Sequence, residues 1–429
     1  VNTYLEESLS YTLKYKTNEE GTYQSLETAH TNVPQSDRAD DYNLAKNITI
    51  PAGETYNYKL TITFNNLSDI NQEADRTAIL NTKFNLGDSI NETITSYRVL
   101  RHLKLNKKEE NPNFAVTPTT DETANGLYSM EDDYGTSYYF RGAVENNYVK
   151  FVGFYWRIIR INGDGSVRMQ YDGTQAWPNA NGQETFTTSG TNRFTHTNIV
   201  WHTMANDAKY VGWMFGGANE TASTSKAQAQ INQTDSNIKK QVDAWYKTNI
   251  ADKNLGRYIS DEIFCNDRST APDGSTWDSK ENSINKGFGN NFTIFGAYYR
   301  SYMENHQVPT ATFICPQKND AFTVSDTLKG NGDLSYPVGL ATADEVMAAG
   351  SGRVGYDSRY NYLYKNSDYY YWLFSPCNFN TVASNHISTW SGSLNGVTTT
   401  FNRNPVANKI AAVAPVINIA PEYAKTMVG

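Results

Sequence analysis

Long apolar runs are missing from this sequence. No stretch approaches the roughly 18–20 consecutive apolar residues that a membrane-spanning helix needs, and no apolar signal core follows Val1. We therefore expect no membrane span. We also expect that a leader segment preceding Val1 has been removed.

Charge is scarce as well. Only 19% of the residues are Asp, Glu, Lys or Arg, the formal net charge is −8, and the one basic run lies at 104–108. A chain of this kind repels phosphate backbones and anionic lipid head groups, so we expect no nucleic-acid partner. Its surface of Asn, Thr, Ser and Gly is typical of exported proteins.

Motifs of common catalytic sites are lacking. The closest of the six histidines, His196 and His202, do not have the HExxH spacing that places two imidazoles on one helix face. No GxSxG elbow, which would expose a nucleophilic serine, precedes a helix. We expect a protein that is not an enzyme and has no cofactor, with calcium as the one exception considered below.

Cysteine occurs only three times, at Cys265, Cys315 and Cys377. The wide spacing matches neither a CxxC pair nor a zinc knuckle. Cys265 and Cys315 each follow a short apolar run, so we expect a disulfide between them, with Cys377 outside it. Three buried, reduced thiols are the alternative.

The 429 residues exceed what one hydrophobic core usually holds, so two or three domains are expected. Residues 1–100 predict a β-sandwich. Residues 101–126 contain two prolines and a charge run without periodicity, which indicates a linker. Residues 127–429 mix helical and strand patterns and predict an α+β domain.

The first region alternates apolar and polar residues with a period of two. Leu9, Tyr11, Leu13 and Tyr15 do so, followed by runs at 56–64 and 80–86. Such alternation places one face on a core and the other in water, as in antiparallel sandwich strands.

The second region opens with two aromatic-rich runs, 148–161 and 166–171, around the turn 162–165, which predicts a hairpin. Residues 236–250 carry an apolar stripe at helical spacing. Thr342 and Glu345 predict a capping box at the start of a second, short helix. Three further strand runs follow, at 369–376, 386–394 and 411–420.

The segment ITIPAGETYNYKLTITFNNLSDINQEADRTAILNTKFNL resembles the camelysin/TasA family of Gram-positive surface and biofilm-fibre proteins. The resemblance implies a jelly-roll-like sandwich and polymerisation through an N-terminal strand donated to the next subunit. On this analogy the donor strand runs from Leu5 to Tyr15, and its apolar side chains are Leu5, Leu9, Tyr11, Leu13 and Tyr15.

Five blocks of the second region, among them FCNDRS, YYYWLFSPC and AVAPVINI, resemble an uncharacterised surface-protein module of gut Firmicutes. WLFSP and APVINI are also similar to the tail of C-type-lectin-like and formylglycine-generating-enzyme-like folds. Ala414 stands where that tail commonly has Arg. Formylglycine-generating enzymes use a reactive cysteine pair, but Arg268 is the sole cation near Cys265 in sequence, so a structural bridge is favoured.

Two further groups are candidate binding residues. One is an oxygen-rich cluster that could hold calcium: Asp267, Asp273, Asp278 and Glu281. The other is a group of tyrosines flanked by Gly, Asp and Arg, which could stack on sugars or contact a protein: Tyr356, Tyr360, Tyr362 and Tyr364.

Together these features predict an extracellular surface protein. The first expectation is a structural subunit of a fibre, pilus-like filament or surface assembly, in which copies associate into a homopolymer by strand exchange. The alternative is an adhesin whose larger domain binds a glycan or a host protein.

Overall fold

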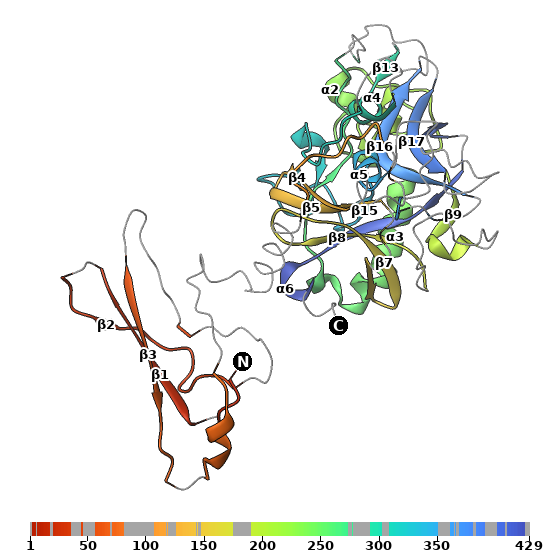
Figure 1. The fold of residues 1–429 in the computed structure, drawn as a ribbon. Helices are drawn as coiled ribbons and strands as arrows, with labels where there is room; N and C mark the ends of the chain where they lie inside the picture. Colours follow the sequence, from red (N-terminus) through yellow and green to blue (C-terminus); the bar gives the residue numbers. More distant parts are fainter. Residues whose placement is uncertain are drawn as a thin grey trace. The chain divides into compact units, whose positions relative to one another are not determined.

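The computed structural model describes residues 2–5, 7–17, 20–35, 44–45, 56–68, 71–80, 107–116, 118, 126–142, 144, 147–174, 190–272, 277, 292–302, 309–350, 361–363, 365, 369–380, 383–390, 401–407 and 410–424. The chain divides into two compact units, Val1–Ile94 and Thr95–Gly429. Both are rich in antiparallel sheet, so the protein is a β-rich, multidomain chain (Figure 1).

The smaller unit contains a three-stranded antiparallel sheet in the order β2-β1-β3. Its strands are β1 (Leu9–Lys16), β2 (Gln24–Ser25) and β3 (Asn57–Phe64). β1 pairs with β3 along its whole length, from Leu9 opposite Phe64 to Lys16 opposite Asn57. With β2 it forms only two pairs. β1 is therefore the central strand.

Alternation in β1 and β3 has the predicted period. Leu9 and Tyr11 are buried, and the Tyr11 hydroxyl donates a hydrogen bond to the Leu44 carbonyl oxygen at 2.7 Å. On β3, Leu60 and Ile62 are half-buried between exposed neighbours. The described residues of this unit form one sheet and contain no second sandwich layer, and most of the third predicted run, 80–86, lies outside them.

The predicted donor segment is not a free strand, because it is already paired within its own chain. Leu9, Tyr11, Leu13 and Tyr15 all lie in β1, between β2 and β3 of the same chain. Leu5 precedes the strand, and its amide donates to buried Asp75 at 2.9 Å. In this structure the segment fills its own sheet, because its alternating apolar face covers the core of its own unit.

The larger unit has a seven-stranded antiparallel sheet in the order β15-β20-β8-β7-β5-β4, with β6 paired to β7. Its strands are β4 (Gly126–Asp132), β5 (Gly135–Arg141), β6 (Tyr148–Phe151), β7 (Phe154–Ile161), β8 (Val167–Tyr171), β15 (Gly339–Leu340) and β20 (Pro415–Ile419).

The second main sheet has six strands in the order β18-β17-β16-β19-β9, with β13 paired to β16. Its strands are β9 (His196–Ile199), β13 (Thr293–Ile294), β16 (Tyr370–Phe379), β17 (Ser384–Trp390), β18 (Phe401–Pro405) and β19 (Ala411–Val413). Two short ribbons complete the strands: β10 (Met214–Phe215) with β11 (Thr234–Asp235), and β12 (Phe264–Cys265) with β14 (Ala321–Phe322).

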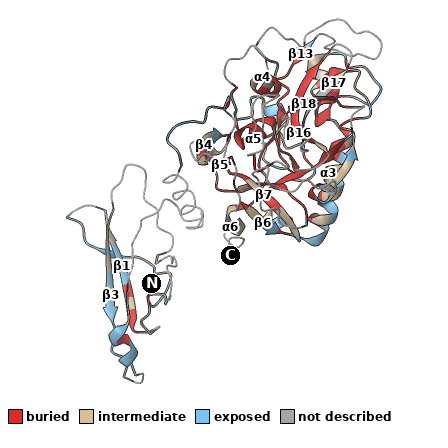
Figure 2. Cartoon of the chain, turned by 45° about the vertical axis from the view of Figure 1, so that its right-hand side comes forward, coloured by how far each residue is buried: buried red, intermediate tan, exposed pale blue. Residues whose placement is uncertain are grey.

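Helices are few and short in the described part of the larger unit. They are α2 (Lys226–Ala229), α3 (Asn237–Asn249), α4 (Gly296–Tyr302), α5 (Ala343–Ala348) and α6 (Pro421–Ala424). Figure 2 shows that the buried residues concentrate in β7, β16 and their neighbours. Of the helices in the described segments, none combines the length and the apolar character that a bilayer crossing requires.

The predicted hairpin is confirmed with one refinement. β7 and β8 pair around the turn 162–166, where Gly165 has a φ of 90° that favours glycine. The aromatic run before it divides at Val152 and Gly153, which turn β6 back onto β7. Alternation alone did not indicate this second turn.

Both predicted helices are present. In α3, Ser236 caps the first turn and Ile238, Val242 and Tyr246 are buried, as the apolar stripe predicts. At α5, Thr342 and Glu345 form the capping box. These local signals were sufficient because each depends on side chains three or four residues apart.

Part of the expected linker, 101–126, packs on the larger unit. Phe114 is buried, and the Arg141 guanidinium lies 5.4 Å from its ring centroid. Arg141 also donates to the Val116 carbonyl oxygen at 2.8 Å, and the Lys108 amide to that of Leu127 at 2.8 Å. One aromatic anchor thus brings a polar, proline-containing segment into the fold.

Candidate functional site

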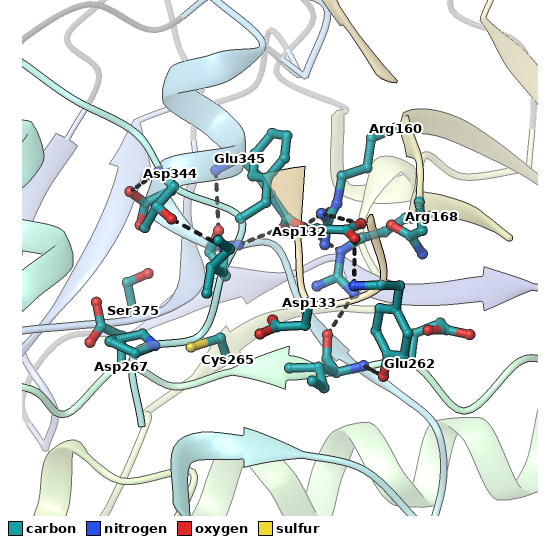
Figure 3. A pocket seen from close by; sticks show the side chains of 18 of the residues that line it. Asp132, Asp133, Arg160, Arg168, Glu262, Cys265, Asp267, Asp344, Glu345 and Ser375 are labelled. Atoms are coloured by element: carbon teal, nitrogen blue, oxygen red, sulfur yellow. Dashed lines mark hydrogen bonds and ion pairs between the residues drawn. The ribbon is translucent and has the colours of Figure 1, made fainter. Parts of the chain in front are cut away.

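The larger unit contains a small, highly charged pocket (Figure 3). It encloses ≈ 30 Å³. Six carboxylates and three guanidinium groups line it: Asp132, Asp133, Glu262, Asp267, Asp344 and Glu345, with Arg160, Arg168 and Arg300. They come from the β4–β5 hairpin, β7, β8, the segments on either side of β12, α4 and the start of α5.

Arg300 joins two of the carboxylates on one side of the pocket. Its Nε lies 2.8 Å from Asp344 Oδ1, and its Nη2 lies 2.7 Å from Asp267 Oδ2. Burial alone would disfavour the charged guanidinium, but the two carboxylates outweigh it and raise the pKa of Arg300. Burial raises the pKa of Asp344, although Arg300 opposes this effect.

Glu345 joins two strands on the other side. Its Oε2 accepts the Thr342 amide at 2.9 Å in the capping box, while Oε1 contacts Arg168 Nε and lies 3.4 Å from Arg160 Nε. Burial lowers the pKa of Arg168, and Glu345 opposes that shift. One side chain therefore both begins α5 and attaches it to β7 and β8.

The three remaining carboxylates, Asp132, Asp133 and Glu262, differ in the number of hydrogen bonds that they accept. Asp132 accepts hydrogen bonds from Arg160 at 3.2 Å and from the Tyr134 and Gly163 amides at 2.8 and 3.0 Å. Asp133 accepts only the Cys315 amide, at 3.0 Å through Oδ2. Among the described residues, Glu262 accepts the Ser260 hydroxyl, at 2.5 Å through Oε1, and its carboxyl adjoins that of Asp164.

Asp133 and Glu262 are thus the two carboxylates of the pocket that form no ion pair among the described residues, although the charges of Arg160 and Lys329 act on Asp133 from a longer distance. Glu262 is 5% exposed and its Oε2 has no hydrogen-bond partner. Burial, and then the nearby Asp164 carboxyl, raise the pKa of Glu262 to about 8. Burial is also the main cause that raises the pKa of Asp133.

One cysteine of a disulfide, Cys265, lines the pocket. Cys265 and Cys315 are bonded, as predicted, and Cys377 is a buried thiol outside the bridge. The bond joins β12 to the segment that carries Ile314 and Pro316, which also line the pocket. Because the Cys315 amide binds Asp133, the bridge holds the β4–β5 turn in position.

A second buried charged cluster lies apart from this pocket. Asp172 Oδ1 accepts hydrogen bonds from Arg193 Nε at 2.9 Å and from Lys365 Nζ at 3.0 Å. Arg157 Nε lies 3.5 Å from Asp172 Oδ2. Burial would favour neutral Asp172, but these cations outweigh it and lower its pKa. Burial lowers the pKa of Lys365 to about 8. The cluster connects β8 to distant segments and lines no described cavity.

The calcium candidates are only partly placed. Asp267 lies in the pocket, but its carboxylate is bound to Arg300 and to the Ser269 hydroxyl, so a cation there would have to displace a guanidinium. Asp273, Asp278 and Glu281 lie outside the described residues. Within the described segments, no group of three or more His, Cys, Asp or Glu side chains is arranged to hold a metal ion.

The tyrosine surface needs a correction. Tyr362 is 1% exposed, and its hydroxyl donates to the Ile159 carbonyl oxygen at 2.9 Å. It is a core residue that fastens its segment to β7, because an aromatic ring with a satisfied hydroxyl is stable in an interior. Tyr356, Tyr360 and Tyr364 lie outside the described residues.

Of the charged residues of the pocket, the sequence analysis named Asp267 as a calcium candidate and Glu345 as a helix cap, but it missed their ion pairs and the rest of the group. A usable signal was present: Arg160 and Arg168 interrupt the apolar runs WRIIRI and SVRMQY. Arginine within a buried strand requires a carboxylate partner. The partners, Asp132 and Glu345, are far away in sequence, so only the fold identifies them.

Comparison of the chain with protein-family models, with curated proteins and with solved structures gives no match. The class of the protein is therefore described from its fold alone. It is a β-rich protein of two units, and the larger unit contains a disulfide and a charged pocket.

Proposed function

We propose that this chain is an extracellular bacterial surface protein, without catalytic activity, that assembles by strand exchange in its smaller unit. In the assembly, β1 of one copy pairs with β3 of the next, and the larger unit is displayed on the outside. We also propose that the smaller unit has a jelly-roll-like fold and that the larger unit has a C-type-lectin-like fold.

The pairing of β1 with β3 carries this proposal. It comprises eight consecutive residue pairs, and among the described residues β3 pairs with no other strand. An exchanged β1 would form the same eight pairs with a second copy, so the exchanged and closed forms contain nearly the same contacts. Exchange of an identical element is a low-cost route to association.

The disulfide supports the proposal that the protein is extracellular. Disulfides persist in oxidising compartments and are rare in the cytosol. Cys265 and Cys315 are bonded across 50 residues of sequence. Four of the six pocket carboxylates are already held in ion pairs with arginine and are not free to act as acid or base, which supports a role without catalysis.

Cysteine cross-linking between two variants tests the exchange. Thr12 and Thr61 are exposed and lie directly opposite each other on β1 and β3. Opposed strand residues have Cα atoms roughly 4.5–5.5 Å apart, within the range that a disulfide spans. Thr12→Cys chains are mixed with size-tagged Thr61→Cys chains under mild oxidation. We expect a covalent heterodimer.

Thr63→Cys is the matched control, because Thr63 is equally exposed on β3 but lies opposite Ser10. The diagonal separation from Thr12 exceeds what a disulfide bridges, at roughly 7–8 Å. Equal cross-linking to positions 61 and 63 would indicate random collision. No cross-link at either position, with both variants folded, would reject strand exchange.

A further inference from the structure

The pocket of the larger unit has acceptors left over after its internal pairing. Its six carboxylates have twelve oxygens, and within the part of the chain that the structure describes all but two have hydrogen-bond or ion-pair partners. The exceptions are Asp133 Oδ1 and Glu262 Oε2. The three arginines are committed to the other four carboxylates.

We propose that this pocket binds a primary ammonium group, carried by a lysine side chain or by a small amine, with Asp133 as its hydrogen-bonding anion and Glu262 Oε2 as a second acceptor. Glu262 is nine-tenths buried, lines the pocket and holds an oxygen without a partner. Asp133 is only half-buried, so its Oδ1 can be reached from solvent. The site does not depend on strand exchange.

The size of the pocket fits a cationic head group. A water-sized group needs roughly 10–15 Å³ by this measure, and the pocket encloses ≈ 30 Å³. An ammonium group and one water molecule fit this space, whereas a sugar ring does not. An alkyl chain attached to the ammonium would extend outward past Ile314 and Pro316, which line the same pocket.

Two residues that line the pocket, Asp133 and Tyr134, already contact one ammonium group. Lys329 Nζ lies 4.3 Å from the Tyr134 ring centroid and donates to the Asp133 main-chain oxygen at 2.9 Å. Lys329 donates to the main-chain carbonyl of Asp133, so Oδ1 of the Asp133 carboxylate can still accept a hydrogen bond. The contact shows that an aromatic ring and an acceptor of this turn suit a primary ammonium.

A metal ion is a poorer match for the same residues. Calcium takes six to eight oxygen ligands, while the pocket offers two uncommitted carboxylate oxygens on different segments, Asp133 and Glu262. An ammonium group has three donors and tolerates a mixture of carboxylate, carbonyl and water acceptors.

Calorimetric titration of the full chain tests the proposal. The probes are n-butylammonium chloride, Nα-acetyl-lysine N-methylamide, 1-butanol as the neutral equivalent, and calcium chloride. We expect both amines to bind and 1-butanol not to bind. The Asp133→Asn variant should weaken amine binding roughly tenfold or more, since a charge-assisted hydrogen bond is lost. Glu262→Gln should weaken it by a smaller factor.

Asp252→Asn is the matched control, because Asp252 is exposed and paired with Lys247 at the far end of α3. It should leave amine binding unchanged, and all variants are checked for folding by tryptophan fluorescence. A preference for the lysine derivative over n-butylammonium would identify a peptide as the source of the ammonium. Equal binding of 1-butanol, calcium binding without amine binding, or unaltered affinity in folded Asp133→Asn would each overturn the proposal.

Discussion

Replacing Glu262 by Gln should make the larger unit more stable above neutral pH. Glu262 is buried beside Asp164 and one of its oxygens has no partner, so its carboxyl is held protonated. A glutamine has nearly the same shape as a protonated glutamic acid and cannot ionise. The substitution therefore removes the titration while keeping the packing.

The size of the effect follows from the pKa. Burial first, and Asp164 second, raise the pKa of Glu262 from 4.5 to about 8. Between these values the folded state holds a proton that the unfolded state has lost, so the free energy of unfolding falls as pH rises. At 1.36 kcal/mol per unit, the fall reaches about 5 kcal/mol by pH 8 as an upper value.

Denaturant unfolding at several pH values between 5 and 9 measures this directly. All eight tryptophans lie beyond residue 150, so their fluorescence reports the larger unit alone. We expect Glu262→Gln and the unchanged protein to be nearly equal at pH 5 and to diverge by several kcal/mol at pH 9. Glu110→Gln, at an exposed position, should show no divergence. Parallel curves for Glu262→Gln and the unchanged protein would refute the reasoning.

Three other changes have defined outcomes. Asp320→Asn should lower the free energy of unfolding by about 3–5 kcal/mol, because fully buried Arg268 loses its carboxylate; an effect below 1 kcal/mol would contradict this. Reduction of the Cys265–Cys315 bond should cost about 4 kcal/mol for a 50-residue loop, measured by denaturant midpoints with and without reductant. Tyr362→Ala should cost about 3–5 kcal/mol by the same assay, whereas a surface tyrosine would cost almost nothing.

The elements that the sequence predicted well have short-range causes. The apolar stripe of α3 and the Thr342–Glu345 capping box depend on residues within one or two helical turns. The β7–β8 hairpin depends on a turn between two apolar runs. The disulfide pairing followed from two similar local contexts, at Cys265 and Cys315.

The rest required tertiary information. A tyrosine in a polar, Gly-containing segment reads as exposed, yet Tyr362 is buried against β7, 203 residues away in sequence. Glu345 was recognised as a cap but not as the partner of Arg168, because the pair is formed only when α5 packs on the sheet. Asp133 gains its place from the Cys315 amide, 182 residues away.

Sedimentation velocity of the purified chain over a wide concentration range, with electron microscopy of the same samples, tests the central claim most directly. Assembly by β1 exchange predicts species larger than the 48.2 kDa monomer that grow with concentration. It also predicts that joining Thr12→Cys to Thr61→Cys within one chain abolishes them. A single species of monomer mass at every concentration would contradict the account.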